Sequence, residues 1–140
     1  MKKFKVITVV GTRPELIRLS RVISCLDKNV EHKLIHTGQN FNFELNEIFF
    51  KDLNLRKPNY QLDGRGSSSI NSISKILLNV EKILIKEKPD AFVVLGDTNS
   101  CLSAYCAKRH KIPIFHIEAG NRCYDERVPE EVNRKIIDHI

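Results

Sequence analysis

Residues 4–15 have the sequence Phe-Lys-Val-Ile-Thr-Val-Val-Gly-Thr-Arg-Pro-Glu, in which a short apolar run leads directly into a turn. The β-branched run from Phe4 to Val10 is typical of a buried strand. Pro14 suits the first turn of a helix, where its missing N–H costs no hydrogen bond. The stretch therefore predicts a strand, a tight turn and a helix, which together open a βαβ unit.

The rest of the chain repeats this alternation of short apolar runs and longer stretches with helical periodicity. Further strands are predicted at His32–His36, Ala91–Leu95 and Ile114–Glu118, with a weaker one at Tyr60–Leu62. Helices are predicted at Pro14–Leu26, from Ser67 to the residue before Pro89, at Asn99–His110, and from Pro129 onward. This order predicts an α/β fold, with a Rossmann-like parallel sheet covered by helices on both faces.

The composition limits the class of protein. The chain has 140 residues, 41% of them hydrophobic, which suits one compact domain. No apolar run approaches the roughly 20 residues of a membrane helix, and the N-terminus lacks a signal-peptide cleavage pattern, so we expect a cytoplasmic protein without membrane contact. The net charge is +6, but no basic cluster with interleaved aromatics occurs, which disfavours nucleic-acid binding. The cysteines form no CxxC pair and are expected to be free thiols.

The turn Gly11-Thr12-Arg13-Pro14-Glu15 predicts a candidate anion site. The first N–H groups of a helix and its positive dipole end point towards the carboxyl edge of a parallel sheet, and Arg13 lies beside them. Arg18 lies one turn further along and adds a second cation. An ordinary turn with surface arginines is the alternative, and this motif alone does not decide between the two.

Acidic side chains follow two further strands. Asp97 comes after the strand that ends at residue 95, and Glu118 ends the next strand, with His116 two residues earlier on the same predicted face. Together with Glu130 and Glu131 at the start of the last helix, four acids are able to converge near two arginines. Such crowding raises carboxyl pKa values towards those needed for general acid–base catalysis. A helix N-cap and a buried His–Glu pair are the structural alternatives.

No motif points to a cofactor. The chain contains neither GxGxxG nor GxxxxGK[ST], and its histidines are not spaced with cysteines as metal ligands are, so we expect no dinucleotide, ATP or metal site. The polar turn His36-Thr37-Gly38-Gln39 ends the second strand and offers further polar contacts, or is simply a turn with satisfied side chains.

Five strand-end and helix-start motifs resemble, in order and spacing, the non-hydrolysing UDP-N-acetylglucosamine 2-epimerases. They are Gly11–Glu15, His36–Gln39, Gly96–Thr98, His116–Gly120 and Pro129–Arg134. The resemblance implies a two-domain GT-B enzyme, with residues 1–140 as the N-terminal domain and the UDP-binding C-terminal domain outside this chain. Because the last predicted helix has no ending signal, we expect a chain cut within that helix. We also expect this chain to be inactive alone and the full-length enzyme to be a homodimer.

The resemblance also implies the chemistry. Members of the family invert C2 of a UDP-linked N-acetylamino sugar, a step in bacterial surface-polysaccharide precursor synthesis. They eliminate UDP and add it back after protonation from the opposite face, without NAD or a metal. The resemblance assigns the catalytic carboxylates to Asp97, Glu118 and Glu130. It assigns binding of the substrate phosphate to Arg13. From their positions at the same edge, we expect Arg18, Gln39 and His116 to be further substrate contacts.

Three alternatives remain at this point. The segments Asn40–Phe50, Leu55–Pro58 and Asn121–Val128 look closer to the subgroup acting on UDP-2-acetamido-2,6-dideoxy-L-talose, which makes that sugar the second candidate substrate. A non-catalytic binding or assembly module, the product of a split gene, is another alternative. A GT-B glycosyltransferase is the third, and the carboxylates in this domain disfavour it.

Overall fold

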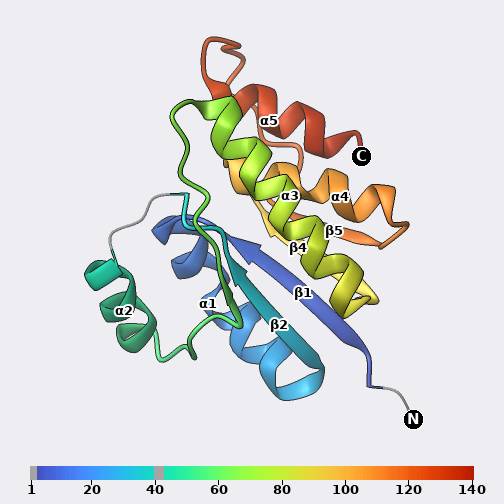
Figure 1. The fold of residues 1–140 in the computed structure, drawn as a ribbon. Helices are drawn as coiled ribbons and strands as arrows, with labels where there is room; N and C mark the ends of the chain where they lie inside the picture. The colour runs from blue at the N-terminus through green and yellow to red at the C-terminus, as the bar shows by residue number, and fades with distance from the viewer. Residues whose placement is uncertain (1–2, 40–42) are drawn as a thin grey trace.

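A computed structural model of the chain describes residues 3–39 and 43–140 and contains a five-stranded parallel sheet (Figure 1). The strands are β1 (Lys5–Val10), β2 (Glu31–His36), β3 (Tyr60–Gln61), β4 (Ala91–Leu95) and β5 (Ile114–Ile117). Their order in the sheet is β3-β2-β1-β4-β5. The predicted Rossmann-like fold class is confirmed.

Helices cover both faces of this sheet. They are α1 (Arg13–Asn29), α2 (Phe43–Asp52), α3 (Ser69–Glu87), the 3-10 helix η1 (Asn99–Ser103), α4 (Ala104–Arg109) and α5 (Pro129–Asp138). Figure 1 shows α1 and α3 on opposite sides of the sheet. One core cluster packs Ile7 of β1 against α3, α4 and α5, and a second packs Val10 of β1 against α1 and α2. Alternate side chains of one strand thus serve the two cores.

Local sequence signals set the ends of the two longest helices. Thr12 is the N-cap of α1 and forms a capping box with Glu15, while Pro14 occupies the first turn. Ser68 caps α3 by accepting a hydrogen bond from the N–H of Asn71 at 3.1 Å. Lys88 then leaves α3 in a left-handed conformation, just before a proline.

Several elements differ from the prediction. Helix α2 was not predicted from the sequence, and the Asn99–His110 segment begins as a 3-10 helix before α4. Strand β5 ends at Ile117, because Glu118 has φ +65° and cannot continue an extended strand. Helix α5, predicted from Pro129 onward, extends to Asp138.

The sheet order places the turns after β1, β2, β4 and β5 along one edge. The strand order reverses between β1 and β4, and ligands of open α/β sheets bind beside the carboxyl ends of the strands at such a point. In the described residues, no helix is long and apolar enough to cross a membrane. The four cysteines are free, as predicted, with Cys101 and Cys106 buried.

Candidate active site at the carboxyl edge of the sheet

The turn between β1 and α1 is closed by its own carboxylate. Oε2 of Glu15 accepts hydrogen bonds from the N–H groups of Gly11 at 2.8 Å and Thr12 at 2.7 Å. Burial raises the pKa of Glu15, and the hydrogen bonds from Gly11, Thr12 and Thr98 oppose that rise. The anion-site interpretation expected these N–H groups to face a ligand. They instead donate to Glu15. An external anion at this turn would be held by arginine side chains.

The same carboxylate connects this turn to the turn after β4. Its Oε1 accepts a hydrogen bond from the hydroxyl of Thr98 at 2.9 Å. Gly11 lies so close to that turn that a Cβ there would stand 2.0 Å from Oγ of Ser100 and 2.5 Å from Oγ1 of Thr37. The turns after β1, β2 and β4 are therefore locked together.

Gln39 strengthens the same junction. Its Oε1 accepts hydrogen bonds from the N–H of Ser100 at 3.2 Å and from the Ser100 hydroxyl at 2.9 Å. The Ser100 hydroxyl also lies 2.7 Å from Oγ1 of Thr37. Gln39 thus lies at the predicted edge, where its amide already contacts the β4 turn.

The two predicted arginines lie in different surroundings. Arg13 is exposed, and its guanidinium stands 5.0 Å from the ring centroid of Phe49 in α2. Arg18 extends to Glu118, with Nη1 2.9 Å from Oε2 and 3.2 Å from Oε1. Of these two arginines, only Arg18 takes part in an ion pair among the described residues. No carboxylate there neutralises the charge of Arg13.

Asp97 and Glu118 end neighbouring strands, each beside an arginine from a helix. Asp97 forms an ion pair with Arg134 of α5, and Glu118 forms one with Arg18 of α1. A Cβ on Gly96 would lie 3.8 Å from Oε2 of Glu118, which shows how close the two turns are. The structure therefore places two of the three predicted catalytic carboxylates on adjacent turns, with Asp97 paired to α5 and Glu118 to α1.

The adjacent acids Glu130 and Glu131 have different environments. Glu131 is buried and accepts hydrogen bonds from the N–H groups of Cys123 at 2.9 Å and Tyr124 at 3.2 Å. The pKa of Glu131 is lowered, mainly by the hydrogen bond from the Cys123 N–H. The expectation that crowding of acids raises this pKa is therefore wrong for Glu131. Glu130 is exposed in the first turn of α5, and its side chain forms no hydrogen bond or ion pair within the described part of the chain.

His116 is oriented by protein groups on the opposite face from Glu118. Its Nε2–H donates to the carbonyl of Gly96 at 2.7 Å, and its Nδ1 lies 3.1 Å from Oδ1 of Asp138. Because β5 ends at Ile117, the alternation that predicted a shared face for His116 and Glu118 stops there. Glu118 turns towards α1, whereas His116 faces α5.

Three residues of α5 near this edge were not assigned a role from the sequence. Arg134 contacts Asp97, Asn133 donates to the Asp97 carbonyl at 2.9 Å, and Asp138 pairs with His116. The Glu131–Arg134 ion pair could have been predicted from the sequence, because residues three apart on a helix are neighbours on its surface.

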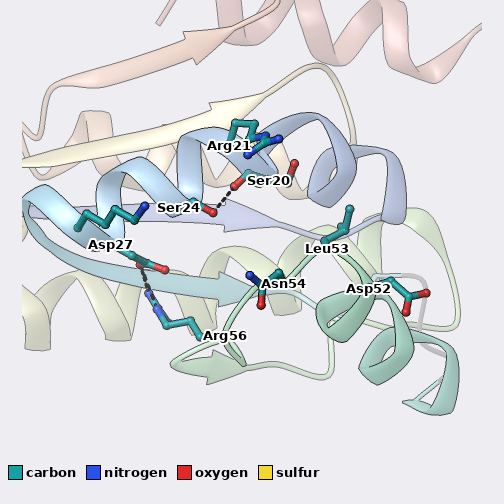
Figure 2. A pocket seen from close by; sticks show the side chains of 9 residues that line it. Ser20, Arg21, Ser24, Asp27, Asp52, Leu53, Asn54 and Arg56 are labelled. Atoms are coloured by element: carbon teal, nitrogen blue, oxygen red, sulfur yellow. Dashed lines mark hydrogen bonds and ion pairs between the residues drawn. The ribbon is translucent and has the colours of Figure 1, made fainter.

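A polar cavity of about 760 Å³ lies elsewhere, between α1 and the segment after α2 (Figure 2). Its lining includes Arg56, whose side chain donates to Asp27 at 2.9 and 3.0 Å. The cavity is lined by Ser20, Arg21, Ser24, Asp27, Lys28, Asp52, Leu53, Asn54 and Arg56. None of the predicted site residues is among them, so this cavity is separate from the carboxylate pair. Residues 40–42 of the segment used to choose between substrates lie outside the described residues.

A family model described as UDP-N-acetylglucosamine 2-epimerase matches residues 25–140. The chain belongs to this family. The resemblance inferred from the strand-end motifs is confirmed, and the parallel sheet agrees with solved structures of the family.

Individual relatives match nearly the whole chain. UDP-N-acetylglucosamine 2-epimerase of Methanocaldococcus jannaschii is 44% identical over 138 residues, covering 97% of this chain and 38% of the relative. UDP-2,3-diacetamido-2,3-dideoxy-D-glucuronate 2-epimerase of Pseudomonas aeruginosa is 40% identical over 139 residues, covering 97% and 39%. The solved UDP-N-acetylglucosamine 2-epimerase of Rickettsia bellii has a TM-score of 0.91 at 60% identity, covering 99% of this chain and 37% of that one. The chain spans less than two fifths of the length of these relatives.

Proposed function

We propose that the complete protein carrying this chain epimerises UDP-N-acetylglucosamine at C2 to form UDP-N-acetylmannosamine. The observation that carries the proposal is the pair Asp97 and Glu118 at neighbouring strand ends, each beside an arginine. Family membership supports it, since relatives that match nearly the whole chain bear this name.

The reaction needs groups of the kinds found at this edge. Removing the weakly acidic C2 proton requires a placed base, and returning a proton to the other face requires a second acid. We assign the base and the acid to members of the set Asp97, Glu118 and Glu130. Glu130 is included because its side chain is exposed at the start of α5 and has no partner among the described residues.

The departing UDP needs cations, because negative charge develops on its diphosphate as the bond to C1 breaks. Arg13 and Arg18 project from the first two turns of α1 and supply that charge. Gln39 adds a polar contact from the β2 turn. We assign no direct substrate contact to His116, because both of its ring nitrogens already face protein groups.

The proposal includes a second domain. The chain spans less than two fifths of its relatives, and the remaining nucleotide contacts are assigned to a C-terminal domain in a GT-B arrangement. We further propose a cytoplasmic homodimer that supplies precursors for surface polysaccharide and uses neither NAD nor a metal.

An assay of the complete gene product tests the proposal. UDP-N-acetylglucosamine is supplied, and UDP-N-acetylmannosamine is measured by chromatography or a coupled reaction, with Asp97→Asn as the inactive control. Epimer formation by the wild-type protein alone supports the proposal. Its absence, with the L-talose derivative also inert, favours a non-catalytic module or, if sugar is transferred to an acceptor, a glycosyltransferase.

A different UDP-2-acetamido sugar is the second candidate substrate. The observation that favours it is the 40% identity to an epimerase from Pseudomonas aeruginosa that is named for a diacetamido uronic acid. The L-talose derivative suggested by the sequence belongs to the same class. Turnover of either sugar at a higher kcat/KM than UDP-N-acetylglucosamine would make this candidate the preferred one.

A further inference from the structure

The turn that carries Glu118 has an unusual backbone. Glu118 has φ +65° and Gly120 has φ +81°, so two left-handed residues flank a single position. Glycine adopts this conformation freely, but a glutamate in it is disfavoured and persists only where surrounding contacts hold it. Contacts that fix this turn therefore decide where the Glu118 carboxylate lies.

Asp138 supplies such contacts from the last turn of α5. Its carboxylate accepts the Gly120 N–H at 3.1 and 3.2 Å, and Nη1 of Arg122 donates to it at 2.6 Å. Only 12% of its side chain is exposed. An acid near a helix C-terminus opposes the helix dipole, so helix stability does not explain this residue.

The charge of Asp138 is compensated by its neighbours. Burial raises the pKa of Asp138, but the hydrogen bonds from Arg122 and Gly120 and the nearby charges of Arg122 and His116 lower it below the usual value. The side chain is thus an anion surrounded by donors, suited to holding several groups at once.

His116 connects this carboxylate to the other catalytic turn. Its Nδ1 lies 3.1 Å from Oδ1 of Asp138, an ion-pair distance, although the two are not aligned for a hydrogen bond. Its Nε2–H donates to the carbonyl of Gly96, the residue before Asp97. A chain of close contacts therefore runs from the Glu118 turn through Asp138 and His116 to the Asp97 turn, and its Asp138–His116 step is a 3.1 Å approach and not a hydrogen bond.

We propose that His116 and Asp138 are positioning residues that fix the Asp97 turn and the Glu118 turn relative to each other. The activity part of this inference rests on the proposed epimerase function. Neither side chain is assigned a contact with substrate, so losing one should move the catalytic carboxylates without removing a binding group. The effect is expected on kcat more than on KM.

The test uses the complete gene product. In Asp138→Ala we expect kcat to fall by about ten- to a hundredfold, the scale of a misplaced catalytic group, with KM changed by less than about threefold. Asp138→Asn keeps an oxygen acceptor for the Gly120 N–H and should retain more activity. The matched control is Glu126→Gln, which breaks the 2.6 Å ion pair with Lys135 of the same helix and should leave kcat unchanged.

A double-mutant cycle sharpens the result. If the two residues act through one path, His116→Gln combined with Asp138→Ala should lose little more than either alone. Additive losses, an unchanged kcat in Asp138→Ala, or a rise in KM with normal kcat would each overturn the inference. Should Asp138→Ala fail to fold by circular dichroism, His116→Gln and Asp138→Asn are judged by the same criteria.

A second measurement separates this inference from the proposed function. If the wild-type protein epimerises no UDP-sugar, the proposed function fails, and positioning is judged by NMR instead. The amide resonances of Gly96 and Asp97 should shift in Asp138→Ala and stay in place in Glu126→Gln. Unmoved Gly96 and Asp97 amides in Asp138→Ala would overturn the positioning role whatever the activity.

Discussion

Nη1 of Arg18 lies 2.9 Å from Oε2 and 3.2 Å from Oε1 of Glu118, although 100 residues separate them in the chain. The pair joins a cation proposed to bind the diphosphate to a proposed catalytic carboxylate. Because the side chains are 57% and 34% exposed, such a pair contributes only about 0–1 kcal/mol and is easily exchanged. An arriving diphosphate should therefore take Arg18 from Glu118 and leave the carboxylate free beside the sugar.

Removing either carboxylate should abolish most of the chemistry. We expect Glu118→Gln and Asp97→Asn each to lower kcat of the complete enzyme by at least roughly a hundredfold, the usual scale for a placed acid or base. UDP affinity should not fall in Glu118→Gln, because Arg18 loses its competing anion. Steady-state kinetics and calorimetry measure the two effects, and near-normal turnover would remove the residue from the catalytic set.

Arg13→Ala should weaken nucleotide binding as well as turnover. The guanidinium stands over Phe49 and has no carboxylate partner among the described ion pairs, so it is available to a phosphate. Loss of one charge-assisted hydrogen bond of about 1.5–3 kcal/mol corresponds to roughly a tenfold or greater rise in the Kd for UDP. Arg21→Ala, on the same helix but lining the separate polar cavity, is the control. Equal Kd values for Arg13→Ala and wild type by calorimetry would refute the assignment.

Gly11→Ala should destabilise the junction of three turns. The added Cβ would stand 2.0 Å from Oγ of Ser100 and 2.5 Å from Oγ1 of Thr37, both fully buried. Overpacking of this kind costs about 1–3 kcal/mol of unfolding free energy. Ser100→Ala removes the nearer atom, so the double variant should recover part of the loss. Urea denaturation measures it, and an unaltered midpoint would contradict the close approach.

Acidification should destabilise the protein through His36. Burial lowers the pKa of His36 to about 4 from 6.5, and its Nδ1 accepts hydrogen bonds from the Gly38 N–H and the Gln61 side chain, each at 3.1 Å. Between pH 6.5 and 4 the unfolded chain binds the extra proton, so stability falls with falling pH and this contribution levels off below pH 4. The shift corresponds to about 3 kcal/mol.

The variant His36→Gln cannot titrate and should lack this part of the pH dependence. Urea denaturation between pH 4 and 7 compares the two proteins. Parallel stability curves for wild type and His36→Gln across this range would show that His36 is not the group responsible.

The sequence predicts the sheet well because its signals are local. The β-branched run ending at Val10 and Pro14 in the following turn specify β1 and the start of α1 without distant contacts. Helix α2 was missed because tertiary packing decides it: Phe50 is buried in the same core cluster as Leu16 of α1, which no local pattern reveals.

The candidate site was predictable only in part for the same reason. Asp97 follows directly from its position after a strand, whereas Glu130 and Glu131 are adjacent and chemically identical. The two differ because the segment 121–128 folds back over the start of α5, where the N–H groups of Cys123 and Tyr124 donate to Glu131. The role of Asp138 likewise depends on where α5 packs.

The most direct test of the central claim follows the C2 proton. The complete gene product is incubated with UDP-N-acetylglucosamine in D2O, and the nucleotide sugars are analysed by NMR and mass spectrometry. Proton removal by one carboxylate and return from the other face predicts UDP-N-acetylmannosamine carrying deuterium at C2, with exchange lost in Asp97→Asn and Glu118→Gln. The account would be contradicted if no epimer formed and no deuterium entered C2 of any UDP-2-acetamido sugar.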